Sequence, residues 1–178
     1  LLVPQDVAMI GVSVKVASVS LLGLQAANVI GLPMISEAYV KKSKEEMGDV
    51  IRMISRVSLL LSTAFLIFVL FFGEYVLSVF GEVFVSSYSL VIIYCMGFWV
   101  NSFFGPSGYL LAVTGNENIN LVLVYVALGC NVLLSIPAII VFGVQGAAVV
   151  TAGLLISRNV TSWVIAKRKI GVSSSAFF

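Results

Sequence analysis

The stretch VSLLLSTAFLIFVLFFG, from Val57 to Gly73, contains no charged side chain. An α-helix rises about 1.5 Å per residue, so this run can cross the hydrocarbon core of a bilayer if its flanking residues help. A dense polar block precedes it, from Glu37 to Arg56, and Glu74 follows it directly. A long uncharged run between charged ends is typical of a membrane-spanning helix.

The composition of the whole chain extends this interpretation beyond one helix. Of its 178 residues, 60% are hydrophobic and 10% are charged, and the mean hydropathy is +1.13. Soluble chains carry roughly 25% charged and about 45–50% apolar residues, so this chain has too few polar side chains to cover a soluble fold. We therefore expect an all-α, polytopic bundle of transmembrane helices.

The same composition excludes several classes of function. The formal net charge is only +2, which argues against a nucleic-acid partner, and the chain has no histidine. Without histidine, His-based metal sites and Ser-His or Cys-His catalytic pairs are excluded. The sequence also lacks a glycine-rich phosphate-binding loop that ends in Lys and Ser or Thr. We expect no enzymatic activity, no cofactor and no metal site.

Charge-free intervals divide the chain into five predicted spans within one bundle. The interval from Val83 to Asn116 is too long for one straight span, and Gly105-Pro106-Ser107-Gly108 should break or bend its helix. Whether that break is a fixed kink or a hinge remains open. Gly143-Val144-Gln145-Gly146 divides the interval that follows Glu117. The predicted spans cover residues 8–35, 51–73, 84–113, 119–142 and 146–166.

Lysine and arginine in the connections predict the orientation. Five basic residues lie in the first connection, residues 37–56, and Lys167-Arg168-Lys169 follows the fifth span. The second and fourth connections contain no basic residue. Because cytoplasmic connections are enriched in Lys and Arg, we expect a multi-pass protein of the cytoplasmic membrane. Its first connection and its C-terminus would face the cytoplasm.

Local patterns predict helix ends and close packing. Ser43-Lys44-Glu45-Glu46 has the spacing of a capping box, so a helix should begin there. Pro33 lies near the end of the first span, where a kink or termination is tolerated. Gly23, Ala27 and Gly31 recur every four residues, a spacing that lets two helix backbones approach closely in lipid.

Lys15 is the most informative polar residue within a predicted span. On a helical wheel Lys15, Ser18 and Gln25 fall within about 80° of one another, which makes a polar stripe on an otherwise apolar helix. A cation at membrane depth usually lines a cavity or finds a partner. The stripe therefore either lines an aqueous cavity that attracts an anionic group such as a phosphate, or Lys15 extends to the outer interface.

Arg158 raises the same question in the fifth span. It either lines a cavity with its neighbour Asn159 or lies near the cytoplasmic end of its helix. We take Lys15, Ser18, Gln25 and Arg158 as the candidate substrate-binding residues. Asn101 and Asn131 are expected to form hydrogen bonds across helices.

Three segments together resemble one family of membrane proteins. Val14–Arg52 contains a basic residue, a span rich in small residues, Pro33 followed by Met34-Ile35-Ser36, and a short polar linker. Phe80–Leu121 contains FGEVF, NSFFGPSG and a TGNE turn, and Cys130–Gly153 reads CNVLLSIPAIIVFGVQGAAVVTAG. In order and spacing these segments resemble the multidrug/oligosaccharidyl-lipid/polysaccharide exporter superfamily, in its polysaccharide-biosynthesis or O-antigen-type flippase branch.

The resemblance implies a transporter of about twelve to fourteen spans in two lobes around a central cavity. It would flip lipid-linked oligosaccharide precursors across the cytoplasmic membrane by alternating access, with Lys15 near the anionic pyrophosphate headgroup. The chain resembles five spans of the second lobe, so its expected partners are the bilayer, that substrate and a first lobe that it lacks. Two alternatives stay open, a drug or metabolite antiporter and a non-transporting remnant or interaction subunit.

Overall fold

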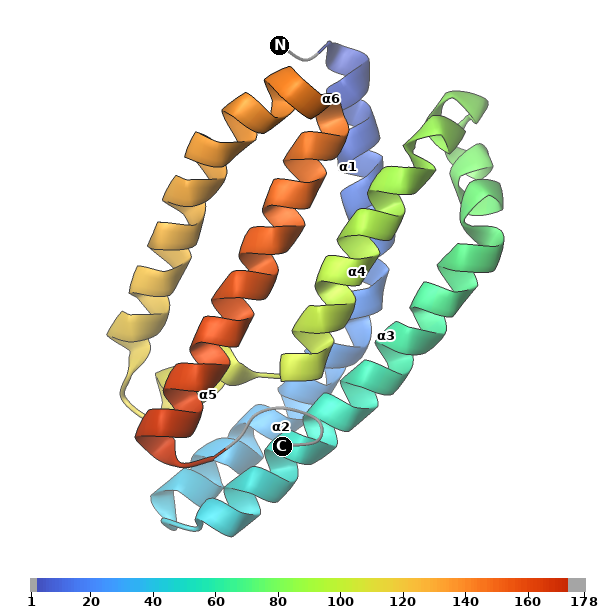
Figure 1. Cartoon of the computed structure of the whole chain (residues 1–178). Helices are drawn as coiled ribbons and strands as arrows, with labels where there is room; N and C mark the ends of the chain where they lie inside the picture. Colours follow the sequence, from blue (N-terminus) through green and yellow to red (C-terminus); the bar gives the residue numbers. More distant parts are fainter. Residues whose placement is uncertain (1–2, 173–178) are drawn as a thin grey trace.

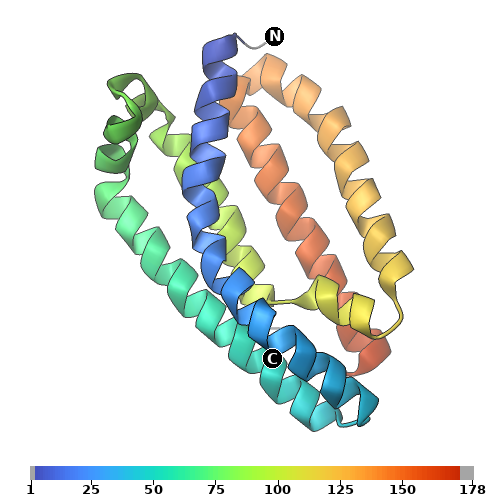
Figure 2. The same cartoon turned by 180° about the vertical axis from the view of Figure 1, so that it is seen from behind.

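The computed structural model describes residues 3–172. Across this part of the chain the secondary structure consists of helices joined by short turns, and no strand is found. The all-α class predicted from the composition is therefore confirmed. The long helices have roughly aligned axes, and successive crossings run in opposite directions, as Figures 1 and 2 show from opposite sides.

The first crossing of the bundle is made by two helices in direct continuation. Helix α1 (Pro4–Ser18) passes through a 3₁₀ segment, η1 (Val19–Leu21), into α2 (Leu22–Val40). These helices extend beyond the predicted span of 8–35 at both ends. Pro33 lies inside α2, and the helix continues past it, whereas the tighter 3₁₀ segment lies about three turns before it.

The second crossing is a single long helix that packs against α2. Helix α3 (Lys44–Phe80) begins where the Ser43 side chain accepts a hydrogen bond from the Glu46 backbone N–H at 3.3 Å, as the capping pattern predicted. A Cβ added to Gly23 would lie 2.8 Å from Leu61 Cδ1, and one added to Gly31 would lie 2.7 Å from Ile54 Cγ1. The close packing predicted from the small residues is confirmed.

The third crossing is shorter than the predicted span of 84–113. A 3₁₀ segment, η2 (Glu82–Ser87), leads into α4 (Tyr88–Phe104), which ends at the predicted break. Gly105 has φ 59° and ψ −151°, a conformation open to glycine but strained for other residues. Helix α5 (Ser107–Val113) follows and is far too short to cross a bilayer.

The last two crossings form one continuous element that folds back on itself. Helix α6 (Glu117–Ile170) is interrupted at Gly143, whose φ of 61° and ψ of −147° are not helical. The two halves are visible in Figure 1 as neighbouring ribbons that meet at the end of the bundle near the N-terminus. This confirms the predicted division, and Gly97 of α4 brings Ala152 of α6 close, because an added Cβ would lie 3.1 Å from Ala152 Cβ.

The α2–α3 turn, α5 and the C-terminal end of α6 lie together at one end of the bundle (Figure 1), which we call the basic end. The predicted cytoplasmic lysines and arginines gather here. Lys41 Nζ lies 2.8 Å from Glu37 Oε1, and this hydrogen bond raises the pKa of Lys41 above its usual value. Lys169 Nζ donates to Asn116 Oδ1 at 3.3 Å, which joins the two ends of α6.

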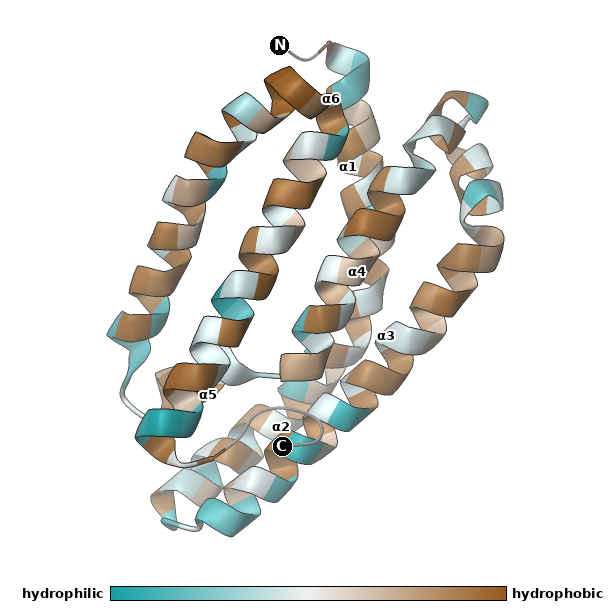
Figure 3. Ribbon diagram, viewed as in Figure 1, coloured by the Kyte–Doolittle hydropathy of each residue, from teal (hydrophilic) through white to brown (hydrophobic). Residues whose placement is uncertain are grey.

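Hydrophobic residues predominate along the helices between the two ends (Figure 3), and many of their side chains are exposed. Leu60 and Phe71 of α3 are 71% and 79% exposed, and Leu133 of α6 is 72% exposed. Within the described residues, four continuous helical stretches are long and apolar enough to cross a membrane, and α6, with its fold at Gly143, accounts for two crossings. Such a surface belongs in lipid or against other protein, which supports membrane localisation.

Candidate functional site

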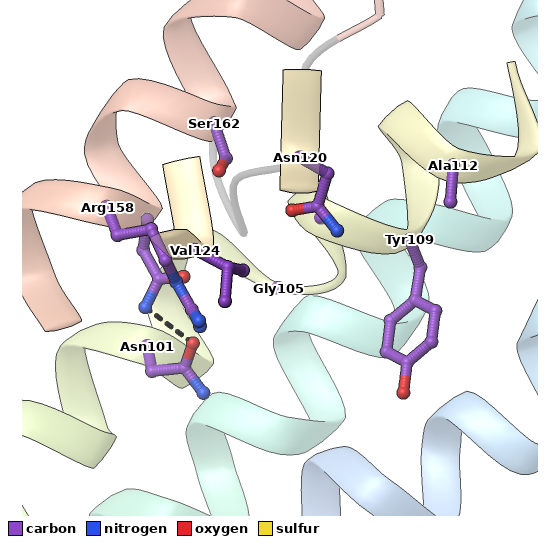
Figure 4. Close-up of a pocket in the computed structure, with 10 residues that line it drawn as sticks. Asn101, Gly105, Tyr109, Ala112, Asn120, Val124, Arg158 and Ser162 are labelled. Carbon is purple, nitrogen blue, oxygen red and sulfur yellow. Dashed lines mark hydrogen bonds between the residues drawn. The ribbon is translucent and has the colours of Figure 1, made fainter. Parts of the chain in front are cut away.

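A polar pocket lies among α4, α5 and both halves of α6 (Figure 4). Its volume is about 310 Å³. Most of its polar groups are amides and hydroxyls, and Arg158 supplies the positive charge. The lining residues are Asn101, Gly105, Gly108, Tyr109, Ala112, Asn120, Val124, Arg158, Asn159 and Ser162.

Contacts between helices define the depth of this pocket in the bundle. Trp99 Nε1 donates to Thr63 Oγ1 at 2.8 Å, so Asn101, two residues further along α4, lies near the level of Leu60–Leu61 in α3. Asn101 in turn contacts Asn159. The part of the pocket lined by Asn101 and Asn159 therefore lies about one helical turn inside the charge-free stretch of α3 that begins at Val57.

Arg158 occupies this depth as a half-buried cation. It precedes Lys167 at the basic end by nine residues, which corresponds to about 14 Å along a helix. Among the described residues, no carboxylate lies within ion-pair distance of its guanidinium. A charge at membrane depth is costly unless it lines a polar cavity or has a partner, and the pocket supplies the former.

The Asn101–Asn159 pair forms one wall of the pocket. Asn159 Nδ2 donates to Asn101 Oδ1 at 2.6 Å, and Figure 4 shows this bond beside the Arg158 side chain. Asn159 is only 6% exposed. Since Asn101 lies one turn before the Gly105 break, the bond ties the end of α4 to α6 at the point where the chain leaves the helix.

Helix α5 forms the opposite wall because a glycine lets it approach α6. A Cβ added to Gly108 would lie 3.1 Å from Asn120 Oδ1, so a larger residue would displace Asn120. Tyr109, next to this glycine, is 52% exposed and lies at the pocket edge. The break at Gly105 and Pro106 thus turns the chain so that α5 closes one side of the pocket.

The structure separates the candidate residues of the first span from Arg158. Lys15 and Gln25 are exposed, Ser18 is half-buried, and all three lie outside the Arg158 pocket. Ser18 Oγ donates to the Lys15 backbone carbonyl at 2.8 Å. The neighbours Val16 and Ala17 of α1 and Leu24 of α2 are buried, so Lys15 and Gln25 lie on the exposed surface of the two helices, with Ser18 at its edge.

The close contact between Gly23 and Leu61 also gives the depth of this outward polar stripe. Since α2 and α3 are antiparallel, Lys15 lies near the level of residue 69 and Gln25 near that of residue 59. Both levels fall within the charge-free stretch from Val57 to Gly73. The stripe of Lys15, Ser18 and Gln25 therefore lies at the level of this charge-free stretch of α3.

Both asparagines that were expected to bond across helices do so. Asn101 accepts from Asn159, and Asn131 Nδ2 donates to Thr151 Oγ1 at 3.1 Å, between the two halves of α6. Ser162, Tyr109 and Asn120 were not recognised as pocket residues from the sequence. The i, i+4 spacing of Arg158 and Ser162 on one helix face was a usable signal for Ser162. The sequence offers no such signal for Asn120 of α6, which lines the pocket because α5 packs against it.

The pocket can form hydrogen bonds with a polar ligand and balance one negative charge. In the part of the chain that the structure describes, no group of three or more Cys, Asp or Glu side chains could hold a metal ion. Comparison with protein-family models, with curated proteins and with solved structures found no match.

Proposed function

We propose that this chain is part of a membrane transporter that flips a lipid-linked oligosaccharide across the cytoplasmic membrane by alternating access. The observation that carries the proposal is the outward polar stripe of Lys15, Ser18 and Gln25 at membrane depth. Polar side chains at this depth rarely face lipid. A second helical body with water between it and this bundle would give the stripe the surroundings that it requires.

The resemblance of the sequence to oligosaccharide-lipid flippases indicates that this second body would be the first lobe of such a transporter. In a two-lobed transporter, the stripe would line the central cavity between this bundle and the first lobe. Lys15 would then attract the pyrophosphate of the lipid carrier, since a lysine is a compact cation that binds phosphate well. The apolar surface of α3 would face lipid or the partner lobe.

The test is flipping of a fluorescent lipid-linked oligosaccharide in proteoliposomes that contain the transporter of which this chain is part. We expect Lys15→Ala to slow flipping by about tenfold or more, because a charge-assisted hydrogen bond is lost. Lys15→Arg should retain most of the activity. Arg168→Ala, an exposed cation at the basic end, is the matched control and should leave the rate unchanged.

Full flipping by Lys15→Ala at equal protein levels would contradict the role of Lys15. Uptake of a drug that depends on an ion gradient, without movement of the lipid-linked substrate, would replace the proposal by an antiporter. Absence of any transport by the unmodified protein would favour a non-transporting remnant or interaction subunit.

A further inference from the structure

The Arg158 pocket combines one positive charge with several uncharged hydrogen-bonding groups. Its amides come from Asn101, Asn120 and Asn159, and its hydroxyls from Tyr109 and Ser162. No carboxylate or second cation is among its lining residues. A half-buried guanidinium without an anionic partner in low-dielectric surroundings favours a ligand that brings one negative charge.

The shape and number of the charged groups favour a carboxylate over a phosphate chain. A guanidinium presents parallel N–H donors in a plane, which match the two oxygens of a carboxylate. A diphosphate carries more charge than Arg158 alone would balance. The cavity of about 310 Å³ is also at the small end of the ~300–1,000 Å³ typical of small-molecule sites, so it suits one ring rather than an oligosaccharide.

The remaining groups suit the hydroxyls and the apolar faces of a sugar ring. An amide both donates and accepts hydrogen bonds, as adjacent sugar hydroxyls do. Asn101 uses its Oδ1 to accept from Asn159, and its Nδ2 makes no hydrogen bond to another described residue. The exposed ring of Tyr109, with Ala112 and Val124, adds apolar contact area.

We infer that this pocket binds the carboxylate and adjacent hydroxyls of a hexuronate residue. This inference rests on the proposed function, since the hexuronate would be one acidic sugar of the oligosaccharide that the transporter carries. The pocket lies about one turn inside the charge-free stretch on the side of the basic end, apart from the outward stripe at Lys15. Arg158 would thus select an acidic sugar, while Lys15 would meet the lipid pyrophosphate.

The experiment titrates the purified full chain in lipid nanodiscs with glucuronate, with glucose and with inorganic pyrophosphate. Binding is followed by saturation-transfer NMR of the ligand and by tryptophan fluorescence, since Trp163 follows Ser162 in α6 and Trp99 lies two residues before Asn101 in α4. We expect glucuronate to bind at least about tenfold more tightly than glucose, because glucose lacks the charge that Arg158 balances. Glucuronate should also bind more tightly than pyrophosphate.

Three variants separate the pocket from general effects on the protein. Arg158→Gln should weaken glucuronate binding by about tenfold or more and remove the preference over glucose. Ala112→Leu fills the pocket from α5 without changing a charge and should also prevent binding. Arg52→Gln removes an exposed guanidinium in α3 that pairs with Asp49, and should leave glucuronate affinity unchanged.

The inference is overturned if glucuronate does not bind at concentrations up to about 10 mM. It is also overturned if pyrophosphate binds more tightly, or if Ala112→Leu binds glucuronate as the unmodified chain does. If Arg158→Gln does not fold, the Ala112→Leu result decides. Glucuronate binding in a protein that flips no lipid-linked substrate would count against the proposed function alone, and flipping without glucuronate binding would count against this pocket alone.

Discussion

Asn159 of α6 donates a hydrogen bond to Asn101 of α4, with 2.6 Å between Nδ2 and Oδ1. The bond lies within the pocket wall and one turn before the Gly105 break. It therefore joins two helices at the place where α4 ends and where the polar cavity begins. Inter-helix hydrogen bonds of this kind contribute about 0.6 kcal/mol on average in a membrane protein and up to about 1.7 kcal/mol.

Asn159→Ala should lower the free energy of unfolding by about 1 kcal/mol, since the half-buried Asn101 loses its hydrogen-bond partner. The measurement is reversible unfolding of the detergent-solubilised protein in SDS. Asn118→Ala is the matched control, because Asn118 is exposed near the start of α6 and should change stability by much less. Equal effects of the two substitutions would show that the inter-helix bond adds nothing.

Gly31→Ala should destabilise the α2–α3 pair by about 1–3 kcal/mol, because the new methyl group meets the Ile54 side chain. Gly11→Ala serves as control in the same helical crossing, since an added Cβ there meets nothing within 4 Å. Both variants are compared by SDS unfolding. If Gly31→Ala is as stable as Gly11→Ala, close packing of α2 on α3 is not required.

Gly143→Ala tests the fold in α6 through its backbone conformation alone. An added Cβ meets nothing within 4 Å at either Gly143 or Gly129, but only Gly143 has a positive φ, 61°. Replacement there should cost about 1–3 kcal/mol, the usual penalty for a non-glycine residue in such a region. Gly129→Ala should be close to neutral. Similar stabilities of the two variants would contradict a strained turn at Gly143.

Cysteine labelling tests the predicted orientation. Lys42→Cys and Lys167→Cys, each in a chain with Cys95→Ala and Cys130→Ala, should react with an impermeant maleimide only from the cytoplasmic side. Glu82→Cys, in η2 at the other end of the bundle, should react only from outside. These outcomes follow from the basic residues at one end of the bundle. Labelling of Lys42→Cys and Lys167→Cys from opposite sides would exclude the five-crossing arrangement.

The helices and their breaks were largely predictable because local chemistry determines them. Long uncharged runs predicted the crossings, Ser43 predicted the start of α3, and Gly143 marked the fold in α6. Pro33 allowed either a kink or a termination, and the structure shows that α2 does not end there. In the third span the break was predicted, but not that the residues after Gly105 form a separate short helix at the end of the bundle.

The pocket was only partly predictable because it depends on contacts between distant segments. Arg158 stood out as a charge within an apolar span. A hydrogen bond from Asn101 to another helix was predictable, because an amide within an apolar span needs a partner. Asn120 enters the pocket only because Gly108 lets α5 approach α6. No periodicity within one helix contains that information, which depends on how the break at Gly105 directs the chain.

In the proposed transporter, the outward stripe of α1 and α2 faces water within the membrane. Gln25→Cys should therefore react with a water-soluble, impermeant maleimide in a transporter without its native cysteines. Thiols react as thiolates, which form in water and not in hydrocarbon. Leu60→Cys is the control, since Leu60 is 71% exposed on α3 at nearly the same depth. We predict rapid labelling of Gln25→Cys and none of Leu60→Cys; equally slow labelling of both would contradict the claim.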